Sequence, residues 1–126
     1  MSTSKIKQDL SFTKDVEVGE YLKLSTGTLA AAGSTNADAA AIAKQVTYVT
    51  ASDDTKGVIL PVVDVGTFIK IHNTVAGQNL KVYPPALGTI NGGTATTGSV
   101  LVAALETATF HKVSSTAWHG GVAVNF

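Results

Sequence analysis

Cysteine and arginine are both absent from this sequence of 126 residues, so its nine basic residues are all lysines. Without cysteine the chain has no disulfide, no thiolate nucleophile and no cysteine-based zinc site. Without arginine it has no guanidinium for bidentate recognition of phosphate or carboxylate. Charged residues make up only 14%, and nine acids balance the nine bases. Because binding to a nucleic-acid backbone depends on clustered positive charge, we expect no nucleic-acid partner.

Long apolar runs are missing too. No stretch reaches the roughly 18 apolar residues of a membrane-spanning helix, and Met1–Lys5 leads into charged sequence instead of the apolar core of a signal peptide. We therefore expect a soluble protein that is made and kept in the cytosol and has no membrane partner. Hydrophobic residues still make up 44% of the chain, which is enough for the core of one domain of this length.

The first 20 residues hold seven of the 18 charges. Such a segment is typical of a solvated or partner-bound arm, or of a frayed terminus with no role. We divide the chain into an N-terminal arm, 1–20, and a β domain, 21–126. Alternating apolar residues around Val18, Leu22 and Leu24 suggest that the first strands begin near this boundary.

An alanine-rich segment, 29–44, separates this region from the strands that follow. Thr35 or Asn36 would cap a helix there, with Asp38 near its N-terminus and Lys44 near its C-terminus, as the helix dipole prefers. So short a helix needs tertiary contacts. The segment therefore predicts one or two helical turns, or a loop.

Alternating β-branched and aromatic residues indicate strands after Gln45. Pro84–Pro85 ends one strand because proline donates no hydrogen bond to a sheet, and Asn91-Gly92 predicts a hairpin. A break is expected at Gly120–Gly121. The predicted strands cover residues 46–50, 58–60, 67–72, 79–83, 100–103, 107–113, 116–118 and 122–124.

Strands at spacings of about 10 to 12 residues are typical of an all-β fold. We predict a single β-sandwich or barrel-like domain with meander or Greek-key connections, an extended N-terminal arm and at most one short helix. Parallel β/α units are excluded because no connection after residue 45 has room for a crossover helix. No internal repeat is evident.

Histidines and acids are the candidate chemical groups. His72, His111 and His119 lack metal-ligand spacing, so we interpret them as polar-face residues, with a pH-sensitive interface as the alternative. Asp53-Asp54 fits a turn in which aspartate binds its own backbone. A glycosidase-like carboxylate pair could be assembled from residues such as Asp64 and Glu106, but the sequence alone does not show one.

Other catalytic signatures are missing. No serine lies in a nucleophile motif, and Gly88–Gly93 matches no phosphate-binding fingerprint. We predict no enzyme, no cofactor, and no catalytic or metal-ligating residue. The 17 threonines and 17 alanines instead suggest sheet surfaces that contact other proteins. Tyr83, Trp118 and Phe126 are core residues or interface anchors, with core burial favoured.

An ordered set of short motifs occupies the stretch from Asp54 to Trp118: Thr55–Pro61, Ile69–Thr74, Val82–Pro85, Gly88–Gly92, Thr107–Phe110 and Trp118. This order resembles small virion proteins of tailed bacteriophages, of the head decoration (cement) type. These motifs serve to end strands and to form turns, so the resemblance assigns no functional residue to this sequence.

The resemblance implies a capsid decoration protein without catalysis, which binds the capsid exterior and stabilises the head after assembly in the host cytoplasm. Its partners would be the major capsid protein and itself, as a homotrimer, with the arm 1–20 reaching the shell or a neighbouring subunit. The alternative is a phage tail or fibre component with a host-surface or glycan-binding role. A small carbohydrate-active enzyme with surface carboxylates ranks last.

Overall fold

The structure is a computed structural model that describes residues 17–122. Within that range it is all-β, with ten strands in two sheets and no helix, which confirms the all-β prediction. The strands are β1 Thr26–Ala30, β2 Ala40–Ala41, β3 Val46–Thr50, β4 Gly57–Ile59, β5 Phe68–Asn73, β6 Leu80–Tyr83, β7 Thr89–Ile90, β8 Val100–Val102, β9 Thr107–Lys112 and β10 Ala117–Gly121.

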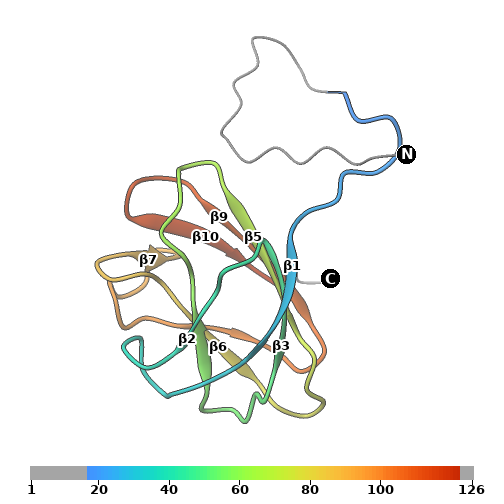
Figure 1. Ribbon diagram of the computed structural model, residues 1–126. Coiled ribbons are helices and arrows are strands. Elements are labelled where there is room, and N and C mark those ends of the chain that lie inside the picture. The colour runs from blue at the N-terminus through green and yellow to red at the C-terminus, as the bar shows by residue number, and fades with distance from the viewer. Residues whose placement is uncertain (1–16, 123–126) are drawn as a thin grey trace, which may run out of the picture.

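The chain passes back and forth between the two sheets (Figure 1). β1, β3 and β5 are parallel neighbours in the six-stranded sheet, and β2, β4 and β6 are parallel neighbours in the four-stranded sheet. Each coil of chain therefore contributes one strand to each sheet. Thr26 pairs with Val46 and Val46 with Lys70, so successive coils advance by 20 and 24 residues.

This arrangement is solenoid-like, and the predicted sandwich or barrel with meander or Greek-key connections is wrong. The expectation failed because it required a helix between parallel strands. Here the crossover is made by a short strand of the opposite sheet, so parallel pairing needs no helix. The coils are also an internal repeat that the sequence did not reveal.

Antiparallel strands complete both sheets. β9 pairs with β5 and with β10, and β8 pairs with β6. The strand β7 lies at the edge of the six-stranded sheet, parallel to β10. Strand pairing thus changes from parallel in the N-terminal coils to mainly antiparallel in the C-terminal half.

The core lies between the sheets, where alternate residues of each strand point inward. Val49, Ile71 and Phe110 come from the six-stranded sheet, and Val58 and Leu80 from the four-stranded sheet; all five are fully buried. Burial of such apolar surface is the main favourable term in folding.

Three local predictions have different outcomes. The segment 29–44 forms no helix: Asp38 Oδ1 accepts hydrogen bonds from Ser34 N and Thr35 N at 3.0 and 2.8 Å, which closes a turn before β2. Asn91 and Gly92 adopt the positive φ of a tight turn, 54° and 72°, but β7 pairs with β10 and forms no hairpin. The break expected at Gly120–Gly121 is absent, since β10 runs through both residues.

Most of the predicted arm lies outside the described residues. Residues 17–20 are exposed, and no strand begins before Thr26 in the described part of the chain. The strand predicted at 122–124 likewise falls mainly beyond residue 122.

Candidate functional site

The six-stranded sheet has a broad solvent-facing side, here called the outer face. Its side chains alternate with the buried ones along each strand. They are Thr26, Thr28, Ala30, Val46, Tyr48, Thr50, Phe68, Lys70, His72, Thr89, Thr107, Thr109, His111, Ala117 and His119. Lys70 is the one member with a full formal charge at neutral pH, and six members are threonines.

The three histidines all lie on this outer face, as predicted for polar-face residues. His72 Nδ1 lies 2.6 Å from Thr107 Oγ1, and the His72 ring meets Tyr48 edge-on, with centroids 6.2 Å apart. His111 meets Phe68 in the same way at 5.7 Å and lies directly opposite His119 in the sheet. Among residues 17–122 no three histidine or carboxylate side chains are grouped to hold a metal ion.

The acidic pair occupies a turn, as predicted. Asp53 Oδ1 accepts hydrogen bonds from Thr55 Oγ1 at 2.7 Å, Thr55 N at 3.0 Å and Lys56 N at 2.9 Å. The Thr55 hydroxyl, followed by the two backbone amides, lowers the pKa of Asp53 to about 2. Asp54 Oδ1 accepts from Asn79 N at 2.7 Å. Both carboxylates therefore stabilise loops by accepting hydrogen bonds from backbone amides.

Asp64 and Glu106, the other carboxylates considered, lie apart. Asp64 precedes the start of β5 and Glu106 the start of β9, and these two strands are antiparallel. The two residues thus lie at opposite ends of a pair about six residues long, roughly 17 Å or more apart at 3.3 Å per residue. A paired carboxylate mechanism needs them within about 10 Å.

Burial is confirmed for two of the predicted aromatic residues. Trp118 is 1% exposed and Tyr83 is 4% exposed. The Tyr83 hydroxyl donates to Ser34 O at 2.8 Å, which ties the end of β6 to the turn before β2. Phe126 lies outside the described residues.

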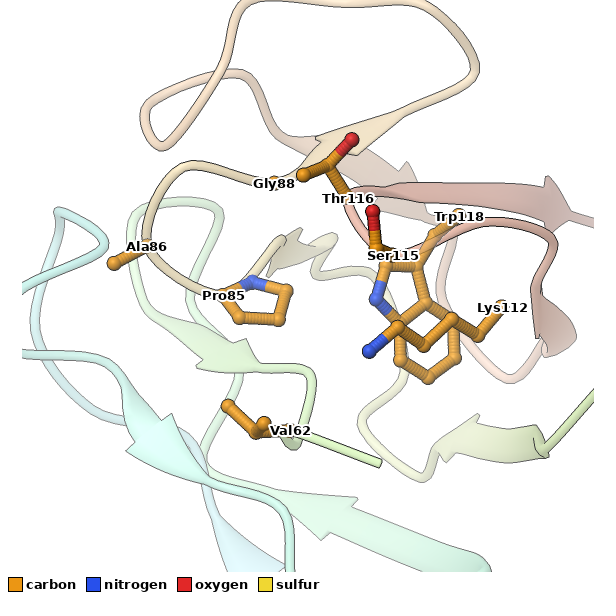
Figure 2. Close-up of a pocket in the computed structure, with 8 residues that line it drawn as sticks. All are labelled: Val62, Pro85, Ala86, Gly88, Lys112, Ser115, Thr116 and Trp118. Carbon is orange, nitrogen blue, oxygen red and sulfur yellow. The ribbon is translucent and has the colours of Figure 1, made fainter. Parts of the chain in front are cut away.

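A pocket of about 100 Å³ opens beside Trp118 (Figure 2). Val62 and Pro85 form an apolar wall, and Lys112 and Trp118 lie across from it. Lys112 was not among the predicted site residues, although strict alternation from Ala108 and Phe110 places it on the inner side of β9. A second hollow, of about 180 Å³, lies on the first coil beside Leu29 and Ala41.

No helix that could cross a membrane is present in residues 17–122. Comparisons with models of protein families, with curated proteins and with solved structures each found no significant match.

Proposed function

We propose that this chain is a structural virion protein of a tailed bacteriophage, which binds the outside of the capsid as a decoration protein and stabilises the head. The proposal starts from the order of motifs between Asp54 and Trp118. The observation that carries it further is the outer face, a wide β-sheet surface with a single full charge. Desolvating such a surface against another protein costs little, because few charged groups lose water.

Its aromatic and histidine side chains suit a protein partner. Tyr48 is 44% exposed, and its ring is in edge-on contact with His72. The exposed part of the Tyr48 ring is therefore accessible to a partner. Tyrosine is among the residues that contribute most to protein interfaces. Binding many copies to a symmetric shell would add stability through multivalency.

The direct test is composition of the particle. Virions are purified from the source phage, and the chain is quantified by mass spectrometry against the major capsid protein. We expect many copies per particle in a fixed ratio to the shell. Absence from purified virions, or a copy number of only a few, would refute decoration, and binding to host cells without binding to shells would support the tail or fibre alternative.

A matched pair of variants tests the docking surface. Tyr48→Ala removes the exposed aromatic group from the outer face, and Leu101→Ala removes an exposed side chain, 54% accessible, from the opposite sheet. Each variant is mixed with shells that lack the protein and sedimented. We expect Tyr48→Ala to weaken binding about thirtyfold or more, in the range of an interface hot spot, while Leu101→Ala binds normally.

The arm and the oligomer are tested separately. Deletion of residues 1–20 is expected to weaken attachment to shells while the circular dichroism spectrum of the β domain is retained. Loss of both the attachment and the spectrum would show that the arm is part of the folded domain. We propose a homotrimer, and sedimentation equilibrium of the free protein and of the shell-bound form checks this.

A further inference from the structure

Trp118 is a buried hydrogen-bond donor with no acceptor in the described part of the chain. Its side chain is 1% exposed, and its indole Nε1–H has no hydrogen-bond partner among the described residues. Buried indole N–H groups normally have a partner, since an unsatisfied polar group in the interior is costly. Trp118 also lines the pocket, so an acceptor placed there can reach this group once the side chains that cover its nitrogen shift.

Lys112 supplies a second donor to the same space. It lies directly opposite Trp118 in the β9–β10 pair, so both side chains point to the inner side of the sheet. Its ammonium donates to Val63 O at 2.5 Å, which leaves two of its three N–H groups for other acceptors. Figure 2 shows the indole and ammonium nitrogens turned toward the space between Pro85 and Val62.

Within residues 17–122, no carboxylate forms an ion pair with this lysine. None of the lining residues is acidic, and the ion pair found within residues 17–122 joins Lys56 to Asp53. A lysine on the inner side of a sheet is unusual, because a charged group there needs a partner. The pocket therefore combines one positive charge, one neutral donor and an apolar wall.

We propose that this pocket binds a carboxylate carried on one or two methylene groups. One oxygen accepts from Trp118 Nε1–H and the other from the Lys112 ammonium, and the methylenes pack against Val62 and Pro85. The volume agrees: a cavity of about 150 Å³ holds benzene, so about 100 Å³ suits four or five non-hydrogen atoms. The group is either a free short-chain acid or the side chain of an aspartate or glutamate from a partner protein. This inference does not depend on the proposed function.

The single tryptophan gives the experiment a specific probe. In a ¹H–¹⁵N spectrum of the full chain, one indole N–H signal reports on the pocket. Sodium propionate is titrated at constant ionic strength, with sodium chloride and neutral propionamide as controls. We expect a saturable downfield shift of the indole signal with half-saturation at about 10 mM or below, as befits so small a ligand, and a much smaller response to either control.

Two variants test the geometry. Lys112→Met keeps the aliphatic stem and removes the ammonium, so half-saturation should rise about tenfold. Val62→Phe enlarges an exposed side chain that lines the pocket and should abolish the shift without unfolding the protein. The control Val65→Phe makes the same change at an exposed position outside the lining and should leave the titration unchanged.

The source of the carboxylate is distinguished by N-acetyl-glutamate methylamide, whose only carboxylate is its side chain. Saturation by this compound assigns the pocket to a protein side chain, and saturation by propionate alone assigns it to a free acid. The proposal is overturned if neither acid moves the indole signal, if propionamide binds as well as propionate, or if Val62→Phe still binds.

Discussion

Asn73 at the end of β5 should be one of the strongest single stabilising side chains in the molecule. It is 0% exposed, and its Nδ2 donates to Gln78 O at 2.7 Å and, more weakly, to Val102 O and Ala103 O at 3.2 and 3.3 Å. Its Oδ1 accepts from Val75 N at 3.1 Å. One side chain thus joins the third coil to the antiparallel half.

The cost of Asn73→Ala follows from these contacts. Two well-formed hydrogen bonds contribute about 1 kcal/mol each net, and the backbone groups left without partners in a buried site add about 1–3 kcal/mol, less where water can enter. We expect a loss of about 3–5 kcal/mol in the free energy of unfolding. For a chain of this size the melting temperature should fall by on the order of 10 °C.

Asn73→Asp separates the donor role from the acceptor role. Aspartate keeps the acceptor for Val75 N but turns a carboxylate toward three carbonyl oxygens, which raises its pKa in the folded state above its value in the unfolded state. The folded state then binds the proton more tightly, so stability is gained at low pH and lost as the pH rises. The deficit relative to wild type should be larger at pH 7 than near about pH 4.

Urea denaturation followed by circular dichroism measures both variants, with Lys70→Ala on the exposed outer face as the control, which should stay within about 0.5 kcal/mol of wild type. If Asn73→Ala also stays within that margin, the hydrogen bonds of Asn73 do not hold the two halves together. A pH-independent deficit for Asn73→Asp would refute the donor role.

Two further predictions concern backbone geometry and pH. Gly120 has a φ of 152°, and an added Cβ would collide with the carbonyl oxygen of Thr109, so Gly120→Ala should cost about 3 kcal/mol or more in the same assay; a neutral result would show that β10 can move away from β9. Because the pKa of Asp53 is lowered to about 2, its contribution to stability is present above the ordinary value of 3.8 and is lost as the pH falls toward 2. Asp53→Asn should therefore show a smaller drop in melting temperature between these pH values than wild type does, and equal drops would contradict the hydrogen bonding of Asp53.

Strand positions could be predicted from the sequence because side-chain alternation is a local signal. The segment Val46–Thr50 is a strand over the predicted residues, and Pro84–Pro85 ends β6 as expected. Pairing could not be predicted in this way. Asn91-Gly92 shows the difference: its tight-turn dihedrals are encoded locally, but the partner of β7 is β10, about 30 residues away along the chain.

The solenoid was missed for a related reason. Its coils share a path and differ in side chains: Ala40, Val58 and Val82 occupy equivalent positions, while the connections between them vary in length. Nothing in the sequence required parallel strands to be connected through a strand of a second sheet. The prediction considered only a helix as the connection between parallel strands, and this chain has no room for one. The alanine-rich segment was ambiguous because alanine favours helices, whereas here its small side chain lets β2 pack against the core.

One of the two candidate sites, the outer face, could be predicted from the sequence, and the other, the pocket, could not. The polar-face interpretation of the histidines needed only alternation, and it placed them on the outer face. The pocket needed the β9–β10 register, because only that pairing brings Lys112 opposite Trp118.

The two sites use opposite sides of the same hairpin. His111 and His119 point outward, and their chain neighbours Lys112 and Trp118 point inward, so one residue step separates the two surfaces. A substitution on one side leaves the other side's contacts intact, provided that the strands keep their register. His119→Ala should therefore leave the propionate titration of the indole signal unchanged, even if it weakens docking of the outer face. A change in both would mean that the hairpin shifts as a unit, and the pocket and the outer face would then have to be treated as one site.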